Sequence, residues 1–200
     1  MTPDAERHAE KMKLRKAHQD RIVSERQGEK GLLIVHTGKG KGKSTAAFGM
    51  AMRAIAHGMK IGVVQFIKGP WESGERDVLR KFPDQVEVHA MGEGFTWETQ
   101  DRERDIRAAR EAWEMSKKFI ADPQVKLVVL DELNIVLRYD YLDLAEVLEA
   151  IAARPADTHV VVTGRNAKDE LIEAADLVTE MTQVKHPFRD GIKAQAGIEF

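Results

Sequence analysis

Residues 32–45 have the sequence LLIVHTGKGKGKST, in which an apolar, β-branched run gives way to a loop of glycine and lysine. Residues 46–54 follow at once and place their apolar side chains at helical spacing. The glycines let the backbone curl so that its N–H groups point at a polyphosphate, at the N-terminus of the next helix. Lys43 adds a positive charge, and the hydroxyl of Ser44 or Thr45 suits Mg²⁺. This stretch predicts a strand, a phosphate-binding loop and a helix.

The loop departs from the usual Walker A spacing. Counting back from Gly42, Lys43 and Ser44, Thr37 stands where the first glycine is expected, and Gly38 follows one residue late. A lysine-rich surface turn is the alternative, but such a turn needs neither a buried strand before it nor an amphipathic helix after it. The sequence therefore favours a variant nucleotide-binding loop.

Composition fits one domain of the α/β class. The chain has 200 residues, and 42% of them are hydrophobic, which is enough for a normal core. Lysine plus arginine (31) nearly balances aspartate plus glutamate (33), and the net charge of -2 gives no sign of a nucleic-acid partner. The lack of cysteine excludes disulfides, thiolate metal sites and a cysteine nucleophile.

Two features of the chain predict a cytoplasmic location. No apolar run approaches the length of a membrane span, so we expect no membrane partner. The first residues are charged where a signal peptide is apolar.

Residues 1–30 form a separate segment in this prediction, ahead of a nucleotide-binding domain at residues 31–200. The segment favours helix but has mixed charge and few apolar residues, so it cannot bury much of itself. A solvated helix is the simpler interpretation. The alternative is an arm that becomes ordered over a ligand or a neighbouring subunit.

Residues 61–67 predict a second buried strand, parallel to the first and adjacent or nearly adjacent to it. Lys68 follows at the carboxyl end of that strand, where ligands bind in open α/β sheets. Arg53 lies on the helix after the phosphate loop. Each of these two cations is either a ligand contact or a solvated surface charge.

The stretch at residues 91–100 has glycines beside two aromatic residues, Phe95 and Trp97. Such a loop is suited to cover an apolar ligand face with its rings. The alternative is that both rings fill the core.

Residues 126–132 predict a buried strand that ends in two carboxylates, Asp131 and Glu132, as in the Walker B pattern. A carboxylate at this position lies beside the phosphate loop and holds Mg²⁺ directly or through water. The alternative is a pair of ordinary acids at a strand end. Arg165 follows a further buried strand at residues 159–163, where it either meets phosphate or is a plain loop arginine.

The remaining elements are predicted from periodicity and from glycine and proline positions. We expect Trp113 in the core, on a long amphipathic helix. The last core strand is expected at residues 177–181, and the tail at residues 184–200 is expected to be a loop with a short extended end. Further helices are expected at residues 75–81, 99–120, 141–153 and 168–175, and a small strand at residues 86–90.

Residue chemistry alone leaves three functional classes open for a protein that binds Mg-ATP or Mg-GTP. They are a kinase or NTPase attacked at the γ-phosphate, a transferase that uses another atom of ATP, and a nucleotide-switched interaction module. The GTP-specific Asn-Lys-x-Asp signature is missing, which disfavours a GTPase switch. A hydrolytic motor would use Glu132 to polarise water, and the carboxylate pair leaves that alternative open.

Several blocks of sequence resemble the P-loop type of ATP:corrinoid adenosyltransferase. They occur in that family's order and extend over essentially the whole chain. The blocks are residues 37–49, 63–69, 94–100, 129–133, 163–165, 184–186 and 191–198.

This resemblance implies a RecA-like P-loop domain with a mainly parallel sheet, preceded by an N-terminal helical arm. It also implies that a cob(I)alamin-type corrinoid attacks the 5′ carbon of ATP and expels triphosphate. A lysine-rich loop with Mg²⁺ suits that reaction, because charge must be stabilised over all three phosphates and no protein nucleophile is needed. A P-loop ATPase or kinase with an unrelated substrate is the runner-up, followed by a non-catalytic nucleotide-dependent interaction protein.

The resemblance also implies roles for individual residues. Phe95 and Trp97 resemble the aromatic pair that packs on the lower face of the corrin and promotes four-coordinate Co(II). Ser44 and one of Asp131 or Glu132 are implied to hold Mg²⁺, with Glu132 the family's usual ligand. The implied ATP contacts are Gly38, Lys39, Gly40, Lys41, Gly42, Lys43, Ser44 and Thr45, with Arg53 and Arg165 as less specific additions.

Partners are implied as well: an electron-donating flavoprotein or reductase, and a second copy of the chain in a homodimer. The N-terminal arm resembles one that caps the corrinoid site of its own or, often in the family, of the neighbouring chain. Two positions depart from the pattern of some relatives. Lys39 replaces asparagine, which puts one phosphate contact in doubt, and Ser44 replaces threonine but keeps the hydroxyl.

Overall fold

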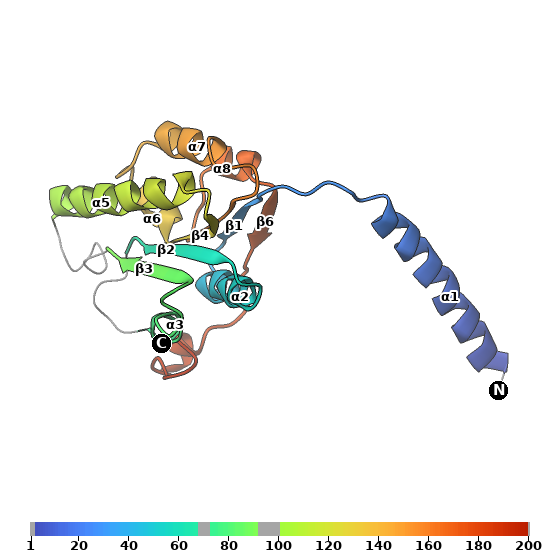
Figure 1. The fold of residues 1–200 in the computed structure, drawn as a ribbon. Helices are drawn as coiled ribbons and strands as arrows, with labels where there is room; N and C mark the ends of the chain where they lie inside the picture. The colour runs from blue at the N-terminus through green and yellow to red at the C-terminus, as the bar shows by residue number, and fades with distance from the viewer. Residues whose placement is uncertain (1–2, 68–72, 92–100, 200) are drawn as a thin grey trace.

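The computed structural model describes residues 3–67, 73–91 and 101–199, and these residues form one parallel sheet with helices around it (Figure 1). The strands are β1 Leu33–Thr37, β2 Lys60–Gln65, β3 Val86–Ala90, β4 Val125–Asp131, β5 His159–Thr163 and β6 Leu177–Glu180. Their order across the sheet is β3-β2-β4-β5-β1-β6. The parallel pairing of all neighbours confirms the predicted sheet type.

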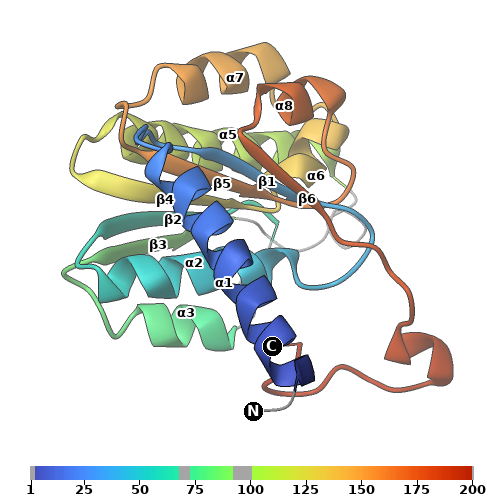
Figure 2. The same cartoon turned by 90° about the vertical axis from the view of Figure 1, so that its right-hand side faces the viewer.

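Helices cover both faces of this sheet. The helices of the described residues are α1 Pro3–Ser24, α2 Lys43–Ala56, α3 Gly74–Leu79, α5 Arg102–Ala121, α6 Leu133–Arg138, α7 Leu144–Ala152, α8 Asp169–Ala174 and the 3₁₀ helix η1 Pro187–Asp190. α2 and α3 lie on one face, whereas α5, α6, α7 and α8 lie on the other (Figures 1 and 2). The result is a three-layer sandwich of helices, sheet and helices.

The inner strands are apolar along most of their length because helices cover both of their faces. Val63, Val129 and Val161 of three different strands are 0% exposed. Trp113 of α5 is 1% exposed, which confirms its predicted place in the core, and its indole N–H donates to Glu146 Oε1 at 2.8 Å. A fully buried indole keeps its polar atom satisfied in this way.

The order of the strands corrects one prediction. β1 and β2 are parallel, as expected, but they are not adjacent, because β5 and β4 lie between them. The connection through α2 leaves space for two strands between β1 and β2, and β4 and β5, which come later in the chain, occupy it. One strand, β5, thus separates the phosphate-loop strand from the strand that ends in Asp131. The parallel sheet flanked by helices agrees with the RecA-like P-loop fold that the family resemblance implied.

Two smaller predictions also differ from the structure, and one helix was not predicted at all. β6 is an exposed edge strand rather than a core strand, since Leu177 is 46% exposed and Val178 is 37% exposed. Helix α6 was not predicted, because its six residues are too few to show a helical period. Of the tail predicted at residues 184–200, the described part, residues 184–199, contains the 3₁₀ helix η1 and ends in turns instead of an extended segment.

Helix α1 stands apart from the other described elements (Figure 1). From residue 4 to residue 24 every side chain is exposed except the half-buried Ile22. Residues 25–32 then lead into β1 without helix or strand structure. None of the described helices, α1 included, has the length and apolar character needed to cross a membrane.

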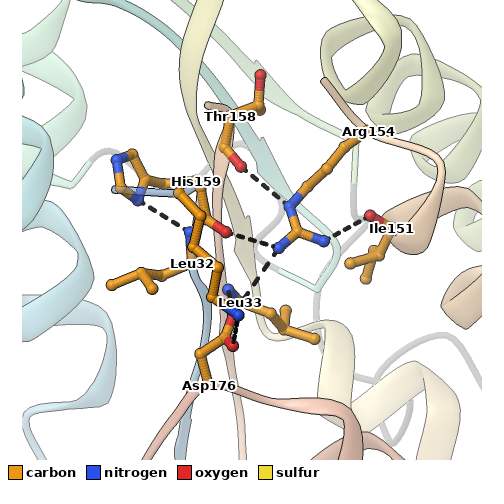
Figure 3. Close-up of polar contacts among 9 residues, drawn as sticks. Leu32, Leu33, Ile151, Arg154, Thr158, His159 and Asp176 are labelled. Atoms are coloured by element: carbon orange, nitrogen blue, oxygen red, sulfur yellow. Dashed lines mark hydrogen bonds and ion pairs between the residues drawn. The ribbon is translucent and has the colours of Figure 1, made fainter. Parts of the chain in front are cut away.

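The chain is fixed to the domain where this segment meets β1 (Figure 3). The guanidinium of Arg154 donates to three backbone carbonyls, those of Gly31 at 2.9 Å, Ile151 at 2.7 Å and Thr158 at 3.0 Å. Its remaining neighbour is the carboxylate of Asp176, at 3.9 Å. The planar arginine fork therefore joins the start of β1 to the turn before β5.

Asp176 completes this attachment. Its carboxylate accepts the backbone N–H of Leu33 at 2.9 Å and pairs with Lys30. The backbone N–H of Leu32 donates to His159 Nδ1 at 3.1 Å. We call Arg154, Asp176 and these partners the arm clasp.

Candidate active site

The phosphate loop, α3, the ends of β4 and β5, and the tail enclose one pocket at the carboxyl edge of the sheet. Its volume is about 200 Å³. The lining residues are Gly40, Lys41, Gly42, Lys43, Ser44, Thr45, Glu75, Glu132, Arg165, Ile198 and Glu199. We call this space the phosphate pocket. It brings together six of the eight predicted loop residues with Glu132 and Arg165, which come from distant parts of the chain.

The loop glycines serve two different purposes. Gly42 has a φ of 102° and begins α2 from a left-handed conformation that favours glycine. Gly38 and Gly40 allow a close approach, because a Cβ would lie 2.5 Å from the carbonyl oxygen of Met181 at Gly38 and 2.7 Å from it at Gly40, and Gly38 also has a positive φ of 95°. The N–H of Gly40 donates to that same oxygen at 2.6 Å. The loop is thus held by the chain after β6, a contact that the sequence did not predict.

Lys43 lies inside the pocket and is only 7% exposed. Its ammonium donates to the carbonyl of Gly40 at 2.5 Å, within its own loop. Burial lowers the pKa of Lys43, and Arg165 and Lys41 lower it further, whereas the nearby Glu132 opposes the shift. Three cations therefore surround a small space, and an added polyanion would relieve their mutual repulsion.

Lys41 has a partner from the far end of the chain. Its ammonium forms an ion pair with the carboxylate of Glu199, and this contact lowers the pKa of Glu199. Ile198 and Glu199 also line a larger, more apolar pocket of about 500 Å³ between α2 and α3. The tail therefore forms a wall of the phosphate pocket.

The two carboxylates at the end of β4 have different environments. Glu132 is half-buried and lines the phosphate pocket. Asp131 is 0% exposed, and both of its oxygens accept hydrogen bonds, from Gln65 Nε2 at 2.8 Å and from Thr163 Oγ1 at 2.7 Å. Of the two acids that the sequence proposed for Mg²⁺, only Glu132 faces the space where phosphate would bind.

The donor set of the pocket fits Mg²⁺ bound together with a nucleotide. Ser44 offers a hydroxyl and Glu132 a carboxylate, which are hard oxygen ligands. Within the described residues there is no group of three or more His, Cys, Asp or Glu side chains able to hold a metal ion alone. Mg²⁺ usually binds through one or two protein oxygens plus phosphates, so this small donor set is appropriate.

The other predicted residues lie elsewhere. Gly38 and Lys39 line a neighbouring pocket of about 480 Å³, together with Asn166 and Arg189. Arg53 is exposed on the last turns of α2 and is not among the residues lining the phosphate pocket. Phe95, Trp97 and Lys68 fall outside the described residues.

Sequence reasoning missed several residues around the pocket. Gln65 and Thr163 end apolar strands beside Asp131, and a polar residue at that point of a buried strand is a usable signal. Glu75 and Glu199 carried no such signal, because their approach to the pocket depends on how α3 and the tail fold back.

Two protein-family models match the chain. The model described as ATP:corrinoid adenosyltransferase BtuR/CobO/CobP matches residues 29–200. The model described as Cob(I)alamin adenosyltransferase N terminal matches residues 1–23.

Curated proteins match over nearly the full length. The corrinoid adenosyltransferase of Pseudomonas aeruginosa is 58% identical over 195 residues, which are 98% of this chain and 96% of that protein. The corrinoid adenosyltransferase of Escherichia coli is 48% identical, with 98% of each chain covered. The corrinoid adenosyltransferase CobA of Salmonella typhimurium has the same identity and coverage.

Solved structures resemble the chain more distantly. The crystal structure of the RadB recombinase has a TM-score of 0.46 and 15% identity, covering 80% of this chain and 78% of that one. Domain III of the Thermotoga maritima replication initiation protein DnaA has a TM-score of 0.39 and 11% identity, covering 82% of this chain and 60% of that one.

Proposed function

Since the chain belongs to the ATP:corrinoid adenosyltransferase family, we propose that it transfers the 5′-deoxyadenosyl group of ATP to the cobalt of a reduced corrinoid. The family match over residues 29–200 is the observation that carries this proposal. In the reaction, Co(I) donates an electron pair to C5′ and a cobalt–carbon bond forms. The C5′–O bond breaks, and inorganic triphosphate leaves with its electron pair. The product belongs to adenosylcobalamin biosynthesis or salvage.

The phosphate pocket is proposed to hold the departing triphosphate. Lys41, Lys43 and Arg165 supply positive charge where negative charge accumulates on the leaving group, and the N-terminus of α2 adds backbone N–H groups. Ser44 and Glu132 would hold Mg²⁺, which neutralises phosphate charge when bound. Gly38 and Lys39 are proposed to contact the nucleotide from the neighbouring pocket. No protein nucleophile or general base is required, because the corrinoid itself is the nucleophile.

Phe95 and Trp97 are proposed to face the corrinoid. The support is their match to the family's aromatic pair within residues 94–100. An aromatic surface under the corrin displaces the axial base, and four-coordinate Co(II) is easier to reduce. Replacing Trp97 with alanine should then slow the reaction from Co(II) corrinoid far more than from chemically prepared Co(I). Equal losses in the two assays would contradict this role.

The arm and the partners extend the proposal. We propose that α1 caps the corrinoid site of its own or a neighbouring chain in a homodimer, since α1 is exposed along nearly its whole length and extends away from the sheet and its helices (Figure 1). An electron-donating flavoprotein or reductase would supply Co(I). We place the reaction in the cytoplasm, where ATP and low-potential electron donors are available together.

One anaerobic assay tests the proposed reaction. Purified protein is mixed with Mg-ATP and chemically reduced cob(I)alamin, and the loss of Co(I) is followed by absorbance. The expected products are light-sensitive adenosylcobalamin and an equal amount of intact triphosphate. ADP and phosphate with unalkylated corrinoid would instead indicate an ATPase or kinase with another substrate.

A further inference from the structure

Three neighbouring strands each place a polar side chain at the same level of the sheet. Gln65 ends β2, Asp131 ends β4 and Thr163 ends β5, and these strands are adjacent in the order β2-β4-β5. All three residues are 0% exposed. Hydrogen bonds join them into a row across the sheet, with Asp131 in the centre accepting from both neighbours.

The row continues into the backbone of Glu132. The N–H of Glu132 donates to Thr163 Oγ1 at 2.9 Å. The hydroxyl of Thr163 in turn donates to the carboxylate of Asp131. Glu132 has a φ of 66°, a left-handed conformation that is uncommon and costly for a residue with a Cβ. The strand therefore stops at Asp131, and the hydrogen bond that the Glu132 N–H donates to Thr163 Oγ1 holds Glu132 in the turn that faces the phosphate pocket.

The row is not arranged for maximum stability. Within the described residues, Gln65 Oε1 has no hydrogen-bond partner although its side chain is fully buried. A buried acceptor without a partner costs about 1–3 kcal/mol, so a purely structural cluster would tend to avoid it. Strained or unsatisfied groups that persist next to a pocket are more often tied to the chemistry of that pocket.

We propose that Asp131 is a positioning residue rather than a metal ligand, and that Gln65, Asp131 and Thr163 together orient Glu132 for the Mg²⁺ of the bound nucleotide. This inference rests on the proposed function only in that Glu132 binds the nucleotide's metal. Outer partners of this kind fix the direction of the ligand, and their loss commonly lowers metal affinity by about 10- to 100-fold. The arrangement assigns to three buried residues a task that neither of the Walker motifs gives them.

The test measures metal binding and needs no corrinoid. The dissociation constant for ATP is determined by calorimetry twice, once in EDTA and once with Mn²⁺. The first value divided by the second is the gain in ATP affinity that the metal provides. Thr163→Val keeps the shape of the side chain but removes the hydroxyl. It should lower the gain by about tenfold or more and leave ATP binding in EDTA unchanged. Thr163→Ser keeps the hydroxyl and should retain the gain.

Double variants separate positioning from direct ligation. Glu132→Gln should lower the gain by itself. If Asp131 and Thr163 act through Glu132, then Asp131→Asn or Thr163→Val should cause no further loss in the Glu132→Gln background. Additive losses would overturn the proposal and make Asp131 a ligand in its own right. Equal losses in EDTA and in Mn²⁺ would also overturn it, because they indicate a structural role.

Thermal unfolding of each variant identifies any that fail to fold. If Thr163→Val does not fold, Asp131→Asn provides the same comparison with almost no change in volume. The outcome is independent of the adenosyl-transfer assay. A wild-type chain that binds Mn-ATP but does not alkylate cobalamin would remove the proposed function and leave this inference standing.

Discussion

The two ends of β1 carry similar chemical groups and use them differently. At the amino end, Arg154 donates to three carbonyls and Asp176 is bound by Lys30 and by the backbone (Figure 3). At the carboxyl end, the one hydrogen bond that Lys43 donates among the described residues goes to a carbonyl of its own loop, and its side chain otherwise faces a pocket. One end uses its charges to hold the chain together, whereas the other presents them to a space of ligand size.

This difference separates a structural cluster from a binding site. A charged group that has already formed its full set of protein contacts has little left to offer a ligand. A buried cation with one contact and a lowered pKa retains both charge and donors for an incoming anion. Substitutions at the amino end should therefore change stability, and substitutions at the carboxyl end should change nucleotide binding.

Lys43→Met gives the largest expected effect on binding. A charge-assisted hydrogen bond to phosphate contributes about 1.5–3 kcal/mol, so ATP affinity should fall roughly tenfold to a hundredfold. Stability should be unchanged or slightly higher, because burial already disfavours the charged form of Lys43 in the folded state. Calorimetry and thermal unfolding measure the two quantities.

Lys30→Met is the matched control for that substitution. Lys30 lies at the other end of β1, and its side chain is 63% exposed. Its removal should leave ATP affinity as it is. An affinity loss as large as that of Lys43→Met would show that the two ends do not differ in the way described.

Arg154→Ala should be the most destabilising of the changes at the arm clasp. It leaves the carbonyls of Gly31, Ile151 and Thr158 without this donor. We expect a loss of about 2–3 kcal/mol of unfolding free energy, or roughly 5–10 °C in Tm, with ATP affinity retained. Arg80→Ala removes an exposed arginine and should change Tm little. A stable Arg154→Ala chain with weakened ATP binding would show that Arg154 serves nucleotide binding rather than stability.

The two ends were not equally predictable from the sequence. The phosphate loop was visible because its glycines, lysines and hydroxyls are consecutive and lie between a clear strand and a clear helix. The arm clasp was invisible, because Arg154 and Asp176 are ordinary surface residue types that are brought to residues 30–33 only by the fold. Local sequence carries no information about such a contact.

The same limit applies within the site. Asp131 and Glu132 were both recognised as a strand-end pair, but their separate environments depend on the neighbouring strands that supply Gln65 and Thr163. The strand order was also missed at one point, because nothing in residues 33–65 shows that β4 and β5 will enter between β1 and β2. Periodicity predicts elements well and their lateral order poorly.

Asp176→Asn tests the electrostatic part of the clasp. The ammonium of Lys30, and then the N–H of Leu33, lower the pKa of Asp176 below its usual range. A carboxylate with a lowered pKa in the folded state stabilises the protein above its unfolded pKa, and this contribution is lost as the pH falls through the folded pKa. The Tm of the wild type should therefore fall more steeply than that of Asp176→Asn between about pH 5 and about pH 3. Parallel curves would show that Asp176 contributes no pH-dependent stability.

Glu199→Gln has the smallest expected effect and tests whether the carboxyl end is partly occupied by the protein itself. The carboxylate of Glu199 pairs with Lys41 at the phosphate pocket, so it neutralises part of the positive charge that Lys41 offers to a phosphate. Removing the charge should raise ATP affinity by about two- to fivefold at low salt, and the gain should shrink as salt screens the pair. Glu173→Gln, on the exposed surface of α8, is the matched control. A lower ATP affinity in Glu199→Gln would mean that Glu199 helps to bind the nucleotide. The binding site at the carboxyl end of β1 would then consist of the tail as well as the phosphate loop.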